Sequence, residues 1–169
     1  MGLLARPSAA RRALRDLTIS LARNPDVVEF ARSVADGWHA RDRIGRVAAA
    51  FTFVSHLVDV PALEDDGVRD GVDHLLHLAG VREGPPVILC ALLQALGERA
   101  CLDEASGLPF VRVEIDAGDL ARLPPHAGPF VDRGRVYLPL DSRDARSALG
   151  FLPRPMRDAL ETRRARGLA

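Results

Sequence analysis

GVREGPPVILCALLQALG, which spans residues 80–97, says more about the fold of this chain than any other segment. The pair Pro85-Pro86 fits only the first turn of a helix, where a missing N–H breaks no intrahelical hydrogen bond. The spacing therefore predicts a helix that runs from near Gly84 to the residue before Gly97. This helix is apolar almost all round, and a helix without a polar face is expected in the middle of a domain, covered on several sides.

Four further helices are expected ahead of this central one. Each has apolar side chains at helical spacing, and they cover residues 8–22, 25–37, 41–57 and 71–79. The clearest boundary is Asn24-Pro25, because Asn24 can cap a helix and Pro25 suits its first turn. Residues 61–71 are acidic and contain glycine, which predicts an exposed loop.

Beyond the central helix the apolar pattern changes from helical to alternating. Residues 110–115 and 135–140 read as half-buried strands. Residues 131–135 predict a tight turn between antiparallel strands, in which Gly134 supplies a positive φ. A helical pattern returns over residues 153–169. Helices first and strands afterwards predict an α+β fold, with N-terminal helices and a buried central helix packed on a small antiparallel sheet.

Composition sets limits on compartment and partners. The 169 residues are 47% hydrophobic and 27% charged, which is ordinary for a soluble domain. Basic and acidic residues number 23 each, so no net positive charge predicts binding to nucleic acid or to an anionic membrane. All basic residues are arginine, which we interpret mainly as coding bias. Two cysteines without a disulfide framework, no signal peptide and no membrane-spanning run predict a cytoplasmic protein.

Several short motifs follow the central helix in a fixed order. They are ALLQALG at residues 91–97, His126-Ala127, DRGR at residues 132–135, and LPLD at residues 138–141. This order resembles the transglutaminase-like, papain-type thiol enzymes, in which a cysteine opens the central helix and a histidine and an aspartate come from adjacent strands. The resemblance implies a papain-type fold and a catalytic triad.

The resemblance extends to the transglutaminase-like proteins of tailed-phage and Mu-like prophage tail gene clusters. It rests on ARNP at residues 22–25, the helix that contains Phe51, and LGF at residues 149–151, and it covers about residues 20–155. It implies a domain over residues 23–155, a helical extension over 1–22 and a helical tail over 156–169.

The chain departs from this pattern at the nucleophile. Counting back from Gly97 places Gly80 on the glycine of the motif and Arg82 on its cysteine. A guanidinium stays protonated at physiological pH and cannot attack a carbonyl. His126 and Asp141 would then be relict catalytic residues, although the prolines that flank His126 would interrupt a strand there.

Other candidate residues have plainer interpretations. Cys90 lies about two turns into the apolar helix and Cys101 follows it, so both are expected to be structural. His74 and His77 have a spacing that could present metal ligands, but no third or fourth ligand is evident nearby. The sequence therefore predicts neither a metal nor a cofactor.

These observations leave three functional hypotheses. The first is a catalytically inactive domain that acts as a binding or structural module for a protein partner, associated with a phage or tail-derived particle. In it, Arg82 pairs with Asp141, with Glu83 or Glu114 as alternative partners, and fills the former active site. The second is an active thiol hydrolase or acyltransferase that uses Cys90 or Cys101 with His126 and Asp141. The third is a pocket for an unrelated small ligand.

Overall fold

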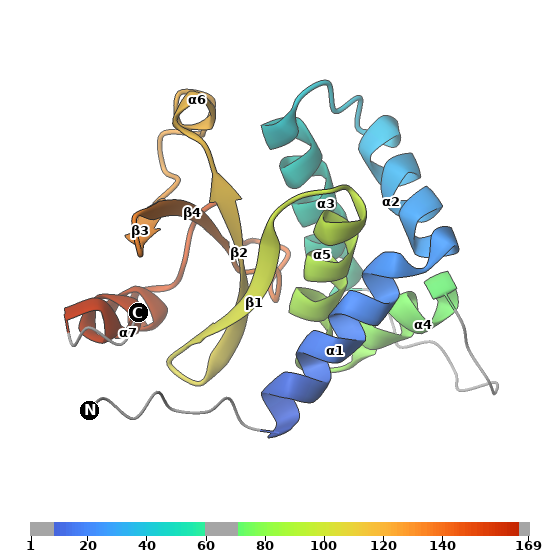
Figure 1. The fold of residues 1–169 in the computed structure, drawn as a ribbon, viewed down its shortest axis with the longest axis horizontal. Helices are drawn as coiled ribbons and strands as arrows, with labels where there is room; N and C mark the ends of the chain where they lie inside the picture. Colours follow the sequence, from blue (N-terminus) through green and yellow to red (C-terminus); the bar gives the residue numbers. More distant parts are fainter. Residues whose placement is uncertain (1–8, 60–70, 166–169) are drawn as a thin grey trace.

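The computed structural model describes residues 9–59 and 71–165 of the chain, which form an α+β fold (Figure 1). The helical half contains α1 (Ala9–Arg23), α2 (Pro25–Gly37), α3 (Arg43–Leu57), α4 (Gly71–His77), the 3-10 turn η1 (Leu78–Gly80) and α5 (Gly84–Ala95). The remainder contains β1 (Ala100–Ala105), β2 (Leu108–Ile115), α6 (Ala117–Leu120), β3 (Phe130–Asp132), β4 (Arg135–Leu140) and α7 (Arg154–Ala165). The predicted loop at residues 61–71 falls almost wholly outside the described residues.

The four strands form one antiparallel sheet in the order β1-β2-β4-β3. The odd-numbered residues of β2, such as Val111 and Val113, face the helices and join the main core. The even-numbered ones point to the opposite face, where Phe110 packs with Met156 and Leu160 of α7 in a second, smaller core. The sheet therefore separates two apolar clusters, as alternation along a strand requires.

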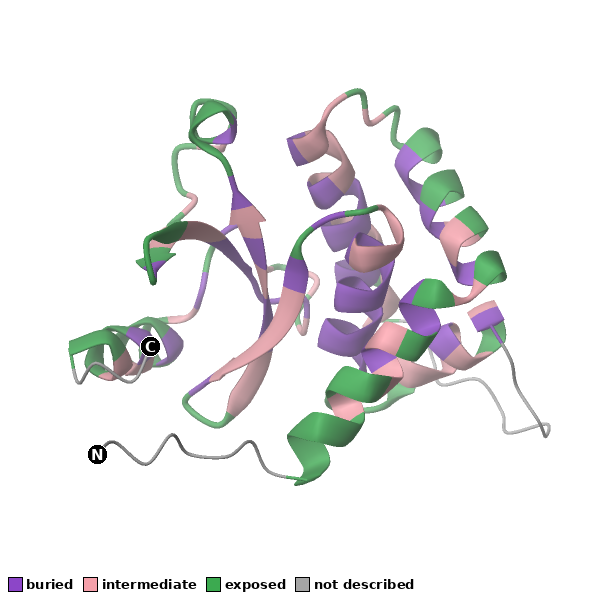
Figure 2. Ribbon diagram, viewed as in Figure 1, coloured by how far each residue is buried: buried purple, intermediate pink, exposed green. Residues whose placement is uncertain are grey.

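Helix α5 occupies the centre of the molecule (Figure 2). Its first ten residues, from Gly84 to Leu93, are all buried. Helices α1, α2 and α3 pack against it on one side, and β1 and β2 on the other. The prediction of a central helix covered on several sides is confirmed, since a helix without a polar face is stable only where neighbours exclude water from its whole circumference.

The local signals in the sequence place several other elements correctly. The side chain of Asn24 accepts hydrogen bonds from the N–H groups of Asp26 and Val27, so α2 starts where predicted. Gly134 has a φ of 76° in the turn between β3 and β4. Along α3, Ile44, Val47, Phe51 and Val54 are buried on one stripe.

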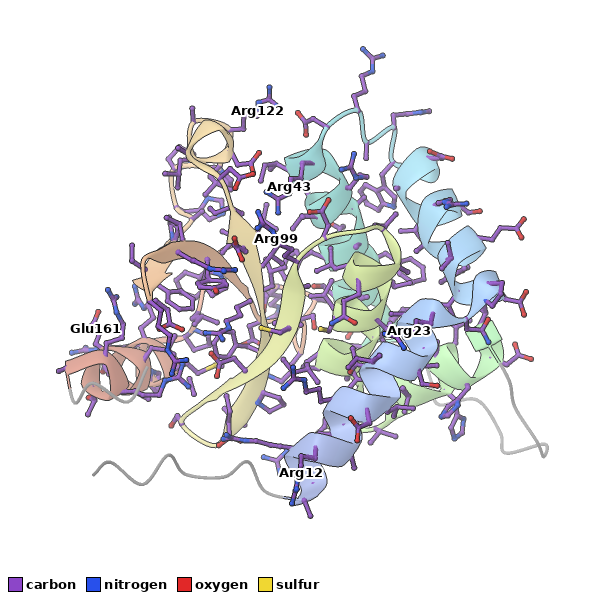
Figure 3. The ribbon with its side chains drawn as sticks, viewed as in Figure 1. Arg12, Arg23, Arg43, Arg99, Arg122 and Glu161 are labelled. Atoms are coloured by element: carbon purple, nitrogen blue, oxygen red, sulfur yellow. The ribbon has the colours of Figure 1, made fainter. Side chains whose placement is uncertain are left out.

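A network of arginines and carboxylates joins α3 to the end of the sheet (Figure 3). The guanidinium of Arg43 donates to Glu98 at 2.7 Å and to Asp119 at 2.8 Å. The Glu98 side chain is only 3% exposed and also pairs with Arg46. Burial by itself disfavours the charged guanidinium, but the two carboxylates outweigh it and raise the pKa of Arg43. The network therefore fixes the helical layer against the sheet.

Candidate functional site

Arg82, the position that the motif assigns to the nucleophile, lies two residues before α5, and the structure closes the helix start that follows it. Gly84, Pro85 and Pro86 form its first turn, and all three are buried. The turn η1 covers them so closely that a Cβ on Gly84 would lie 1.6 Å from the carbonyl oxygen of Leu78. Only glycine fits the first position of α5, because the backbone of Leu78 fills the space that another residue's Cβ would occupy.

The same turn also lacks the donors that acyl transfer needs. A tetrahedral intermediate is stabilised by N–H groups aimed at its oxyanion. Pro85 and Pro86 have no N–H, and the N–H of Gly84 donates to the carbonyl of Val81 at 2.8 Å. Two of the first three residues thus have no donor to offer, and the third uses its own within the turn that precedes the helix.

Arg82 does not fill the site as predicted. It lies in the turn before α5, and its side chain is exposed. The buried carboxylate of Asp141 binds Arg143 instead, with the Nε at 2.7 Å from Oδ1 and the terminal nitrogen at 2.8 Å from Oδ2. Among the described residues no ion pair joins Arg82 to Asp141, and the prediction of that pair is wrong. Arg143 is only two residues away along the chain, so it reaches the carboxylate at less entropic cost.

His126 and Asp141 lie in different surroundings. His126 is exposed in a turn between α6 and β3, which agrees with the expectation that its proline neighbours interrupt a strand. It borders a cavity of about 220 Å³ beside α7, whereas Asp141 borders a separate one of about 330 Å³ with Arg143. No hydrogen bond joins the two side chains in the part of the chain that the structure describes.

The strand next to Asp141 offers no substitute for the histidine. Strand β2 pairs with β4 so that Val111 lies opposite Leu140. Continuing this antiparallel register by one residue places Phe110 opposite Asp141. Phe110 is fully buried and apolar, so the neighbouring strand supplies no general base at that position.

The two cysteines are free and lie near each other. Both border a cavity of about 260 Å³ at the open edge of β1, beside α1. Cys90 is fully buried, and this burial, together with the nearby Cys101, raises the pKa of its thiol. Cys101 is half-buried, and the Nε of Arg112 lies 3.1 Å from its sulfur. Neither cysteine has a histidine partner within the described residues.

The structure adds nothing to the metal hypothesis for His74 and His77. Across residues 9–59 and 71–165, no group of three histidine, cysteine or carboxylate side chains is placed to hold a metal ion. In the same ranges no helix is both long enough and apolar enough to span a membrane.

Sequence reasoning missed Arg143 as the partner of Asp141. The signal that could have revealed it is the spacing Asp-Ser-Arg at residues 141–143, which places a cation two residues after a carboxylate at the end of a buried strand.

Comparison of the chain with protein-family models, with curated proteins and with solved structures gave no match.

Proposed function

We propose that this chain is a catalytically inactive, transglutaminase-like domain that acts as a binding or structural module for a protein partner. The observation that carries the proposal is the closed first turn of α5. A papain-type enzyme needs a nucleophile and free N–H donors at this helix start, and the turn at Gly84–Pro86, which packs against the backbone of Leu78, offers neither. A helix buried on a small antiparallel sheet supports the family resemblance at the level of architecture.

The remaining parts of a triad support the same proposal. Asp141 is held by Arg143 rather than by a histidine, and His126 is exposed to solvent in a turn. Among the described residues, neither a carboxylate nor a thiol forms a hydrogen bond with His126, so it has no bonded partner with which to perform acyl transfer. The resemblance of the sequence to tail-cluster proteins of phages leads us to propose a phage-derived or tail-derived particle as the setting of this module.

An assay for acyl transfer tests the proposal. The purified chain is incubated with a glutamine-containing peptide and a fluorescent primary amine, while released ammonia is followed in parallel. We expect neither amine incorporation nor ammonia release above the level of the heat-denatured chain. Turnover that is lost in His126→Ala or Asp141→Asn would overturn the proposal.

One observation favours a second candidate function, that of a thiol enzyme centred on Cys101. The guanidinium of Arg112 donates toward the Cys101 sulfur at 3.1 Å, which is the kind of neighbour that reactive thiols have. This candidate requires the turnover described above to disappear in Cys101→Ser and to survive in Cys90→Ser. The first candidate predicts no turnover to lose.

A further inference from the structure

The cavity of about 220 Å³ that His126 borders lies between α7 and two loops. One loop leads into β3 and the other leads into α7, which Figure 1 shows beneath β3. The volume is below the range of about 300–1,000 Å³ that is usual for drug-sized ligands. The cavity therefore fits the end of a ligand rather than a whole cofactor. We name it the α7 cleft.

The two loops of the α7 cleft are held together by close contacts. Gly150 has a φ of 76°, and a Cβ there would lie 2.7 Å from side-chain carbons of both Ala127 and Leu138. The N–H of Gly128 donates to the carbonyl of Gly150 at 2.9 Å and so ties one loop to the other. The cleft is thus formed in the free chain, as ligand sites usually are.

Apolar groups make up much of the lining. They belong to Pro129, Phe130, Pro139, Phe151, Leu152 and Leu160. Phe151 is 42% exposed, so part of its ring is available to an apolar group of a ligand. This part of the cleft favours a ligand that brings a side chain to bury as well as a charge.

Helix α7 adds a stripe of charge to the apolar lining. Arg157, Glu161 and Arg164 follow one another at intervals of four and three residues, which places them on one face of the helix. All three side chains are exposed. Among the residues that the structure describes, no ion pair joins any of the three to another charged group. The cleft thus has two guanidinium groups that no carboxylate of the described chain holds.

The position of Arg157 suits the recognition of an anion. Its spacing to Glu161 would allow an ion pair, but the guanidinium lies over the ring of Phe151, 5.5 Å from the centroid. Stacking uses the flat face of a guanidinium and leaves the N–H donors in its plane free for a carboxylate. His126 can add a further N–H donor in either protonation state.

The other charges of α7 are already paired. Arg154 lies 3.7 Å from Asp158, and Arg163 lies 2.9 Å from Asp103. The charged groups that α7 presents to the cleft are therefore two guanidinium groups and the single carboxylate of Glu161. A group with one negative charge suits this surplus of one, and the guanidinium fork matches the two oxygens of a carboxylate.

The end of a polypeptide offers this combination of groups within the space of one residue. Its carboxylate and its last side chain leave the same Cα, so both can enter a small cavity while the rest of the chain leaves from its mouth. We propose that the α7 cleft binds the C-terminal carboxylate of a partner protein whose last residue is apolar.

This site rests on the binding role proposed above, but the two fail separately. Acyl-transfer turnover would refute the binding role, whereas failure to bind a peptide end would remove this site alone.

The test titrates the full chain by calorimetry with acetyl-Gly-Ser-Gly-Leu and acetyl-Gly-Ser-Gly-Phe, both with a free carboxylate. We expect at least one of the two to bind. Its C-terminal amide and the peptide that ends in glycine should bind at least about tenfold more weakly, because the first lacks the charge and the second lacks the apolar group. A smaller loss with either peptide, or no binding at all, would overturn the proposal.

Two variants test the residues of the cleft. Arg157→Gln/Arg164→Gln should weaken binding at least about tenfold. Glutamine is a good helix former and no ion pair of the described chain is lost, so thermal unfolding should show an intact fold. Glu161→Gln removes the one carboxylate of the cleft and should tighten binding, by up to about fivefold. A smaller loss in the double variant, or no gain in Glu161→Gln, would contradict the assignment.

The matched control is Arg12→Gln/Arg32→Gln, which removes two exposed arginines from α1 and α2 and should leave binding unchanged. A loss equal to that of Arg157→Gln/Arg164→Gln would show a general effect of charge and overturn the proposal. Isovalerate, phenylacetate and inorganic phosphate are titrated in parallel. If any of them binds as tightly as the peptide, the occupant is a small anion and not the end of a partner protein.

Discussion

Replacing Gly84 by alanine probes the closed start of α5 with a single methyl group. Gly84 is the first residue of the helix, and its φ is not among the positive ones of this chain, so alanine is allowed there by the backbone. The obstacle is contact alone. The added Cβ would lie 1.6 Å from the carbonyl oxygen and 2.6 Å from the carbonyl carbon of Leu78, in the η1 turn.

The size of the effect follows from two opposing contributions. Alanine in place of glycine normally stabilises a helix by about 0.5–1 kcal/mol. Forcing a methyl group into a filled space costs about 1–3 kcal/mol or more, and here both sides of the contact are backbone or buried helix, which cannot rotate away. A contact of 1.6 Å puts this cost at the upper end of the range or beyond it, about 3 kcal/mol or more. Subtracting the helix gain leaves a loss of at least about 2 kcal/mol in the free energy of unfolding of Gly84→Ala, which corresponds to about 4–8 °C in Tm for a domain of this size.

The assay is urea denaturation followed by circular dichroism, with Gly37→Ala as the matched control. Gly37 ends α2, and a Cβ there would meet nothing within 4 Å. The control should be as stable as the wild type or slightly more stable. A free energy of unfolding for Gly84→Ala within about 0.5 kcal/mol of the wild type would show that η1 leaves room at the start of α5.

Two further predictions concern Asp141 and Cys90. Arg143→Ala should destabilise the chain by about 3 kcal/mol, because it leaves the carboxylate of Asp141 buried without its bidentate partner. The control Arg146→Ala, at an exposed arginine nearby, should change the stability little. Equal Tm values for the two variants would contradict the pairing of Arg143 with Asp141. The raised pKa of the buried Cys90 thiol means that the unfolded chain loses this proton near its ordinary pKa of 9.0 while the folded chain keeps it. The neutral Cys90 thiol therefore makes its full contribution to the free energy of unfolding below pH 9. This contribution falls as the pH rises above 9, by at most about 1.4 kcal/mol per pH unit. Between pH 9 and 11 the free energy of unfolding should therefore fall less steeply in Cys90→Ala than in the wild type, and parallel slopes would show that Cys90 ionises normally.

Features set by neighbouring residues could be predicted from the sequence. Asn24-Pro25 fixes the start of α2 because Asn24 accepts hydrogen bonds from two N–H groups that lie no more than three residues after it. The apolar circumference of α5 predicts burial whatever surrounds it. Strand β4 also has the predicted bounds, since its alternation and its turn are local signals.

Features that depend on distant segments could not be predicted. The pairing of Arg163 in α7 with Asp103 in β1 joins residues 60 positions apart, and it exists only because α7 returns across the sheet. The pair Arg82–Asp141 was predicted from electrostatics alone, but an exposed arginine gains little from a carboxylate that a neighbour already holds. His126 likewise lies in a turn, as its proline neighbours predict, and not on a strand, as the motif implies.

The central claim is that no thiol in this chain is activated for acyl transfer, and the rate of iodoacetamide labelling tests it most directly. Intact-mass spectrometry at neutral pH gives the rate for the wild type, for Cys90→Ser, for Cys101→Ser and for His126→Ala. We predict slow labelling of the half-buried Cys101, slower labelling of Cys90, and no effect of His126→Ala. Rapid labelling of one cysteine that falls when His126 is replaced would contradict the account, because it would show a working thiol–histidine pair.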